Sequence, residues 1–213
     1  MGVGAIPHIT RRRLATARTK YRHGGLRELV LHTSLLLGYH RIFFFESAFL
    51  PVAATPAAKV PLDFEFVGPE GLDEVSRFRD DLPRETLQDR FERGERCFVA
   101  RSHGEIVAAY WIHRLDVPLP EVGRTIRVPE DAVYVGDAWV SENLRGLGVG
   151  AAVSREVKNR LADEGYARWV FFVLAGNPAG LANAYHSDAT ETARAAALKL
   201  GRLPAIPLPF LTG

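Results

Sequence analysis

Residues 133–150 read VYVGDAWVSENLRGLGVG, and this stretch decides the fold of the chain. An apolar strand ends at Val140, a polar turn follows over 141–144, and a glycine-rich run leads into an amphipathic helix. Glycines let backbone N–H groups approach a ligand closely, and the positive end of a helix favours anions. Arg145, at the start of the run, adds a fixed positive charge. The stretch therefore predicts a site for a phosphate-bearing cofactor, in particular a pyrophosphate.

Two common nucleotide-binding motifs do not fit this stretch. A Walker loop ends in Gly-Lys-Ser/Thr, whereas this run closes with Gly148-Val149-Gly150-Ala151. A dinucleotide-binding motif needs an acidic residue after the next strand, and the strand expected at 169–174 is followed by Ala175-Gly176-Asn177. The expected cofactor is therefore of another kind.

Working outward, the sequence alternates short strand and helix patterns. Periodicity and turn residues predict strands at 41–50, 63–67, 97–101, 105–113, 132–140 and 169–174, and helices at 24–38, 70–78, 83–93 and 149–164. The proline-rich stretches 51–61 and 114–131 are expected to be a linker and a loop. This order predicts an α/β (α+β) fold, with a single sheet and helices on both sides.

Length and composition indicate one globular domain with an extension. The chain has 213 residues, of which 47% are hydrophobic and 24% charged, and this excludes a fibrous or wholly disordered chain. The prolines of 51–61 divide it into a basic N-terminal extension, 1–60, and a catalytic body, 61–213. Ionisable residues interrupt the most apolar stretch, 26–50, so no transmembrane segment is expected.

The single cysteine, Cys97, excludes an internal disulfide and a zinc site built from several thiolates. The histidines show no metal-ligand spacing, so no metal is expected. A cytoplasmic location is expected, since no secretory signal peptide is apparent.

The net charge of +2 hides an uneven distribution. Residues 1–41 hold eight basic residues and one acidic residue, whereas the rest of the chain holds 19 basic and 24 acidic residues. Such a basic arm suggests an acidic partner surface, although a solvated tail fits equally well. We expect the apolar stretch 24–50 to pack on the body or on a second subunit, which leaves a homodimer open. No nucleic-acid partner is expected.

The glycine run and its surroundings resemble the GNAT superfamily of acyl-CoA-dependent N-acyltransferases. Residues 145–150 match the R/Q-x-x-G-x-G/A signature of that family, the preceding strand ends at Val140, and the following strand ends at Asn177. The resemblance covers 63–213 and is specific at 133–177. It implies a GNAT-like central mixed sheet flanked by helices, to which this chain adds an N-terminal helix–strand extension.

The resemblance implies a reaction and a cofactor site. An acyl group would move from acetyl-CoA or another acyl-CoA to the amine of a small molecule, carrier or peptide, through a ternary complex. Backbone groups of two strand residues would pair with the pantetheine arm, the amides of the glycine run would hold the pyrophosphate, and the asparagine would contact the pantetheine or the acceptor. In order, these cofactor-binding residues are Trp139 and Val140; Arg145, Gly146, Leu147, Gly148, Val149 and Gly150; and Asn177.

Acyl transfer to an amine needs a base for the ammonium and an acid for the leaving thiolate. Asp137, expected on the opposite side of the sheet from Val140, and Glu142, just past the strand, are the candidate bases, directly or through water. Asp137 fits a structural carboxylate equally well. Family members often carry a Tyr seven residues after the Asn, which acts as the general acid for the thiolate. Here that position is Ala184, so the next residue, Tyr185, is the candidate acid.

This shift suggests that 178–192 is inserted or rearranged. Two alternatives stay open: a non-catalytic acyl-CoA-binding module in a regulatory or assembly protein, and a transferase of a longer acyl chain. Acceptor contacts are expected from three variable segments, which are 79–94, 114–131 and 178–192.

Overall fold

The computed structural model describes residues 38–49, 57–120, 122–199 and 203–208. The strands are β1 (Tyr39–Ala48), β2 (Asp63–Val67), β3 (Arg96–Ser102), β4 (Glu105–His113), β5 (Val117–Leu119), β6 (Arg124–Ile126), β7 (Ala132–Val140), β8 (Arg168–Leu174), β9 (Thr190–Leu198) and β10 (Ile206–Leu208). The α-helices are α2 (Leu72–Phe78), α3 (Arg84–Glu92), α4 (Val149–Asp163) and α5 (Pro178–His186), and 3-10 turns form η1 (Pro69–Gly71) and η2 (Glu142–Leu144). The helix expected at 24–38 and most of the linker lie outside the described residues.

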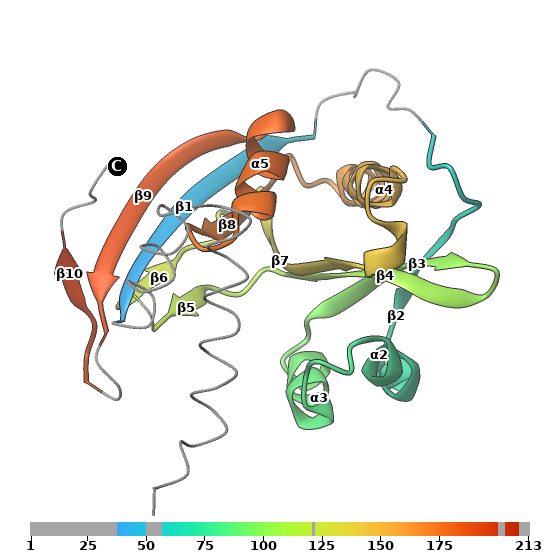
Figure 1. The fold of residues 1–213 in the computed structure, drawn as a ribbon, viewed down its shortest axis with the longest axis horizontal. Coiled ribbons are helices and arrows are strands. Elements are labelled where there is room, and N and C mark those ends of the chain that lie inside the picture. Colours follow the sequence, from blue (N-terminus) through green and yellow to red (C-terminus); the bar gives the residue numbers. More distant parts are fainter. Residues whose placement is uncertain (1–37, 50–56, 121, 200–202, 209–213) are drawn as a thin grey trace, which may run out of the picture.

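Eight strands form one sheet in the order β10-β9-β1-β8-β7-β4-β3-β2 (Figure 1). β7 and β8 run parallel, whereas the other neighbouring strands run antiparallel. β7 is followed by α4 and then by β8, the crossover connection that parallel neighbours require. The expected α+β fold with a central mixed sheet and flanking helices is confirmed.

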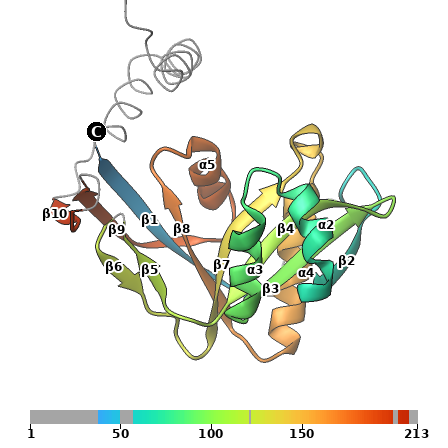
Figure 2. The same cartoon turned by 90° about the horizontal axis from the view of Figure 1, so that it is seen from below.

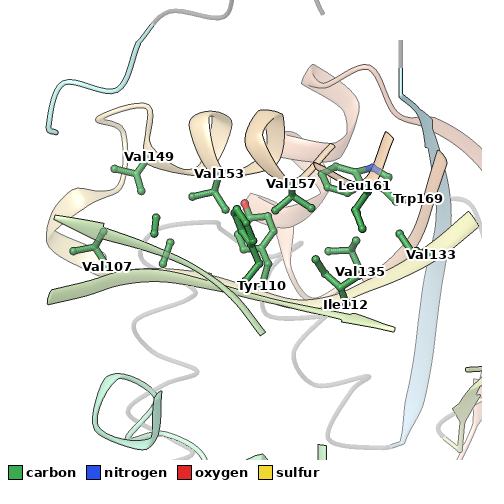
Figure 3. Close-up of a cluster of buried hydrophobic side chains, with 13 residues drawn as sticks. Val107, Tyr110, Ile112, Val133, Val135, Val149, Val153, Val157, Leu161 and Trp169 are labelled. Atoms are coloured by element: carbon green, nitrogen blue, oxygen red, sulfur yellow. The ribbon is translucent and has the colours of Figure 1, made fainter. Parts of the chain in front are cut away.

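Helices cover both faces of the half formed by β2, β3, β4 and β7 (Figures 1 and 2). On one face, α4 places Val149, Val153, Val157 and Leu161 over strand side chains such as Val135 (Figure 3). Their spacing of four residues puts them on one side of the helix. On the other face, α2 and α3 pack over Val99, Ala109 and Trp111.

The other half of the sheet is covered by α5 and by the β5–β6 hairpin, on opposite faces (Figure 1). Phe45 and Val173 point to the α5 side, together with Ala184 of that helix. Ile42 and Ala197 point to the hairpin side, together with Leu119. Both faces of the sheet are therefore covered along much of its length. Where β7 meets β8, the covering elements change from α4, α2 and α3 to α5 and the β5–β6 hairpin.

The strand expected in the N-terminal extension is confirmed, and it is central. β1 pairs with β8 along one edge and with β9 along the other, and its Ile42 and Phe45 are 0% and 1% exposed. The expectation that this segment packs on the body therefore holds for 39–48. The proposed boundary at residue 60 stays a prediction, although β1 shares its sheet with strands of the body.

Several segments differ from the sequence analysis, which did not predict the strands β9 and β10. The loop expected at 114–131 contains the β5–β6 hairpin, whose three-residue strands are too short, and with Pro118 too irregular, to show an alternating pattern. Segment 178–192 forms α5 and the start of β9. Within the described ranges, the structure contains no helix with the length and apolarity needed to cross a bilayer.

Candidate active site

The parallel strands β7 and β8 separate soon after they meet. They pair only from Ala132 to Tyr134 on β7 and from Arg168 to Val170 on β8. Beyond Tyr134, no strand of the described chain pairs with the β8-facing edge of β7, which continues to Val140. Backbone N–H and C=O groups on such an edge can pair with an extended ligand, as an added strand would. The structure places Trp139 and Val140 on this open edge.

The glycine run follows at the end of the open edge. After β7, the chain passes through η2 and enters α4 at its N-cap, Gly148, which has the left-handed φ of +82°. A Cβ on Gly148 would meet Ala58 only at an ordinary contact distance of 3.4 Å, so it is the left-handed φ that favours glycine here. Gly146 has a φ of +78° and open space where its Cβ would be. The turn therefore exposes backbone rather than side chains.

The first turn of α4 is suited to an anion. The N–H groups that open a helix have no partner within it, and no side chain caps α4 at Gly148. A Cβ on Gly150, in that first turn, would make only ordinary contacts at 3.7 Å and beyond. Unpaired amides, the positive helix end and room for close approach fit the pyrophosphate expected of coenzyme A. No cluster of three His, Cys, Asp or Glu residues that could hold a metal occurs among the residues described.

Asp137 sits on a β-bulge in β7. Across β4, Gly136 pairs with Trp111 and Trp139 pairs with Ala109, so β7 has one extra residue at this point. Asp137 takes a φ of +47°, a left-handed conformation that Asp tolerates better than most residues. Bulges commonly re-aim a side chain beside an active site. Here the carboxylate points to the α2/α3 side, whereas Val140 packs on the α4 side, so the two residues face opposite sides as expected.

Two arginines hold the Asp137 carboxylate. Arg90 of α3 donates from Nη1 to Oδ2 at 2.6 Å, and Nη1 of Arg79, just after α2, lies 2.9 Å from the same oxygen. The Arg79 side chain is only 2% exposed and forms a second, bidentate pair with Asp81. Because burial alone would disfavour the charged guanidinium, the two carboxylates are what raise the pKa of Arg79 above its ordinary value.

Trp139 connects Arg79 to the glycine turn. The guanidinium carbons of Arg79 and Arg145 each lie 5.0 Å from the indole ring, a cation–π distance. Arg145 also donates from Nε to the backbone oxygen of Val140 at 3.2 Å and pairs with Glu142 at 3.3 Å. Glu142 lies in η2 and its side chain is 78% exposed. The structure thus brings Asp137, Trp139 and Arg145 into one connected group, with Glu142 at its solvent edge.

Asn177 and Tyr185 lie on the α4/α5 side. The Asn177 side chain caps α5, since its Oδ1 accepts from the N–H of Gly180 at 2.9 Å. Tyr185, near the end of α5, is half exposed and donates its hydroxyl to Glu191. That hydrogen bond raises the pKa of Tyr185, which keeps the phenol protonated at neutral pH. Asp137 and Tyr185 therefore stand on opposite faces of the sheet, on either side of the gap between β7 and β8.

The sequence analysis missed the arginines and Tyr134. Arg90 lies in α3 and Arg79 just after α2, in a part of the sequence with many charges, where a solvated side chain is the usual expectation. The signal for them is Asp137 itself, because an acidic residue in an apolar strand requires cationic partners. Tyr134 lies over Gly136, where a Cβ would approach its ring to 2.6 Å. Burial raises the pKa of Tyr134 well above its ordinary value, so its hydroxyl stays protonated.

Cys97 is a core residue. It is 0% exposed between the sheet and α2, and burial raises the pKa of its thiol to about 12. A thiol in that state is a poor nucleophile at neutral pH.

Comparisons with known proteins agree with this geometry. The sequence model of the acetyltransferase (GNAT) family matches residues 65–185, more than half of the chain. The chain therefore belongs to the GNAT acetyltransferase family. The match contains α2, α3, the open edge of β7, the glycine turn, α4 and most of α5. No curated protein matches the sequence.

Solved structures share the fold at low sequence identity. A GNAT-family acetyltransferase from Colwellia psychrerythraea aligns with a TM-score of 0.54 and 16% identity over 73% of this chain and 54% of that one. A conserved protein of unknown function from Staphylococcus epidermidis aligns with a TM-score of 0.52 and 10% identity, over 78% of this chain and 64% of that one. A putative acetyltransferase from Novosphingobium aromaticivorans aligns with a TM-score of 0.50 and 14% identity, over 73% of this chain and 61% of that one. This chain thus spans less than two thirds of the length of each.

Proposed function

We propose that this protein is an N-acyltransferase that moves an acyl group, in the simplest case acetyl, from acyl-CoA to the amine of an acceptor. The observation that carries the proposal is the open edge of β7 running into the glycine turn at the start of α4. This arrangement offers backbone pairing to an extended arm and amides to a pyrophosphate. Membership of the GNAT family supports the same reaction.

The proposed cofactor contacts follow from this placement. Trp139 and Val140 present backbone groups to the pantetheine arm, and the amides of 145–150 receive the pyrophosphate. In this structure, Nε of Arg145 donates a hydrogen bond to the carbonyl oxygen of Val140. Since that carbonyl is proposed to pair with the pantetheine arm, we expect the arginine side chain to turn toward the phosphates when coenzyme A binds. Because Oδ1 of Asn177 caps α5, the NH2 group of its side chain would be the donor to the pantetheine or the acceptor.

The chemistry is proposed to use both sides of the gap. Asp137 or Glu142 would take the proton of the acceptor ammonium, directly or through water, and Tyr185 would supply a proton to the departing thiolate. Of the two carboxylates, Asp137 has the better position, on the side lined by the conformationally fixed arginines, whereas Glu142 is largely in solvent. The clamp by Arg79 and Arg90 equally supports a positioning role for Asp137, so both roles enter the test below.

Binding of the donor can be tested at Gly150. Gly150→Asp adds an acidic side chain to the first turn of α4, where it favours the helix but repels a pyrophosphate. Gly150→Ala is the matched control, since its Cβ meets only ordinary contacts. We expect Asp to weaken coenzyme A binding at least tenfold by calorimetry, and Ala to leave it nearly unchanged. Equal affinity of a folded Gly150→Asp variant would refute the pyrophosphate assignment.

A second candidate is an acyl-CoA-binding module without catalysis. It is favoured by two contacts: Asp137 is engaged by two arginines, and the Tyr185 hydroxyl is engaged by Glu191. Thiol release from acetyl-CoA and longer acyl-CoAs, measured across a panel of amines, separates the candidates. Turnover with any amine supports the transferase, and tight donor binding without thiol release supports the module.

For the acceptor, only the chemical class is proposed: an amine on a small molecule, a carrier or a peptide. The homodimer and the cytoplasmic location likewise stay predictions.

A further inference from the structure

A cavity of about 440 Å³ lies on the hairpin side of the sheet, apart from the residues proposed to hold coenzyme A. Residues of β8, β1 and β9 form its floor, and residues of the β5–β6 hairpin line its other side. Figure 2 shows the hairpin beside these strands. It opens to solvent and has the size of an ordinary small-molecule site. The open edge of β7 and the first turn of α4 do not line it.

The cavity is apolar inside. Phe44 of β1, Val170 of β8 and Ala193 of β9 contribute to the floor, and Leu119 and Ile126 contribute from the hairpin. Leu119 is 2% exposed and packs with Ile126 against the sheet, so the hairpin is firmly seated and the cavity is a built part of the fold. An apolar molecular body can therefore be buried here.

Two of the three cationic groups at the cavity are arginines of the hairpin. Arg124 pairs across the hairpin with Leu119, which puts both side chains on the sheet-facing side, and Arg127 also lines the cavity. Both are exposed, and among the described residues neither forms an ion pair. Arg194 contributes as well, but its side chain is engaged by Glu191. Within the described ranges, the hairpin thus offers two guanidinium groups without an ion-pair partner, and such groups favour carboxylate or phosphate.

The single acidic residue of the lining does not cancel this charge. Glu46 is paired with Arg168 at 2.9 Å, and Arg168 also pairs with Asp131 at 3.0 Å. The chain's own N-terminal segment is a poor occupant, because residues 1–37 carry seven basic residues and one acidic residue. Charge therefore selects a separate, anionic molecule.

We propose that this cavity is a binding site for a small organic anion with an apolar body, such as a carboxylate or phosphate on a hydrocarbon or aromatic group. The apolar part lies against Phe44, Val170 and Leu119, and the anionic group meets Arg124 and Arg127. None of its residues is among those proposed to hold coenzyme A, so binding here can be tested apart from the donor site. The hairpin does belong to segment 114–131, from which acceptor contacts are expected.

The test is a fluorescence titration of the full chain with anilinonaphthalene sulfonate, an aromatic anion of this class. We expect binding of one dye per chain that persists in saturating coenzyme A. The double variant Arg124→Glu/Arg127→Glu should weaken it at least tenfold, about 1.4 kcal/mol. Ala193→Phe, which fills the cavity from an exposed position facing Phe44, should abolish it. Arg77→Glu, the same charge reversal on the exposed surface of α2, is the control and should change nothing.

Displacement identifies the headgroup. Octanoate and octyl phosphate should release the dye, whereas octanol and octylammonium, with the same tail, should not. Each variant is first shown to keep the thermal midpoint of the wild type, so that dye uptake by a loosened core is excluded. Absence of dye binding, equal binding by all variants, release by octanol, or release by coenzyme A would each overturn the proposal.

Discussion

Asp137 is the residue at which a chemical and a structural role must be separated. Its carboxylate can accept a proton only if the two arginines leave an oxygen accessible, and the side chain is 26% exposed. If it is the base, Asp137→Asn should lower kcat by about 10²–10⁴, and the loss should shrink at high pH, where the amine is already neutral. A pH–rate profile measures both effects.

Glu142→Gln is the companion to that experiment. Glu142 pairs only weakly with Arg145 at the solvent edge, so we expect little change in stability from this variant. A loss in Asp137→Asn that is constant across pH, with a lowered thermal midpoint, identifies a positioning residue whose removal releases the buried arginine. Wild-type rates in both variants would exclude carboxylate base catalysis at these positions.

Tyr185 allows a cleaner substitution. Its ring packs edge-to-face on Phe45, with centroids 5.3 Å apart, and Phe at this position keeps that contact. If the hydroxyl protonates the thiolate, Tyr185→Phe should lower kcat by about 10² without changing the thermal midpoint. An acyl donor whose leaving thiol is more acidic depends less on protonation of the thiolate, so the fall in kcat caused by Tyr185→Phe should be smaller with that donor. An unchanged kcat with the ordinary donor would remove Tyr185 from the mechanism.

At the residue scale, the sequence predicts the conformation of the glycine turn better than the surroundings of the candidate catalytic groups. The backbone conformation of 145–150 is local and is dictated by glycines, so spacing alone suffices. The environment of Asp137 depends on Arg79 and Arg90, which come from helices more than 45 residues earlier. The bulge also breaks the strict alternation that a sequence-based strand assumes.

At the scale of elements, α4 is joined to β1 and to the turn before β9 by one buried lysine. Lys158 is 7% exposed, donates to Ser47 at 2.7 Å, and contacts both oxygens of Asp188 at 2.6 and 2.7 Å. A charge this far from water requires its counter-ion. The link is one that no periodicity reveals, because its three parts are far apart in the sequence.

Asp188→Asn should therefore lower the free energy of unfolding at neutral pH. We expect roughly 1–2 kcal/mol, less than for a fully buried pair because Asp188 is half exposed. Although burial opposes ionisation of Asp188, hydrogen bonding to Lys158 holds its pKa below the ordinary value. A lowered folded-state pKa adds stability above the unfolded pKa, near 4, and loses it as the pH falls through the folded value.

Urea denaturation at pH 7 and at pH 3 measures this contribution. The difference between wild type and Asp188→Asn should be present at pH 7 and smaller at pH 3. Asp163→Asn, an exposed carboxylate at the end of α4, is the control and should be close to neutral at both values. A variant as stable as wild type at pH 7 would show that the buried lysine finds its compensation elsewhere.

For the molecule as a whole, the sequence predicts the class and most of the elements, but not the strand order. Hydrophobic periodicity and turn residues locate nine of the helices and strands to within a few residues, because those signals are local. Nothing local indicates that β1 enters between β8 and β9, since partner choice in a sheet depends on residues more than a hundred positions away. The hairpin that closes the anion cavity is missed for the same reason: its strands are held by the sheet beneath them.

The position of β1 makes a strong prediction about the extension. Removing 1–60 takes out a central strand, exposes facing edges of β8 and β9, and deletes Ile42 and Phe45, each worth roughly 1.5–3 kcal/mol of burial. With the lost ladder bonds this approaches the 5–15 kcal/mol that stabilises a typical domain. The 61–213 fragment should therefore aggregate or unfold, whereas removing 1–23 should leave the thermal midpoint nearly unchanged.

Phe45→Ala tests the same idea in the intact chain. Phe45 is 1% exposed and stacks on Phe171 at 5.3 Å, so the cavity left behind should cost about 3–5 kcal/mol in urea denaturation. Phe49→Ala, after the end of β1 and only partly buried, is the comparison and should cost less. A soluble, monomeric 61–213 fragment with full activity would contradict the structural role of β1, because the two strands it separates would then have to pair without it.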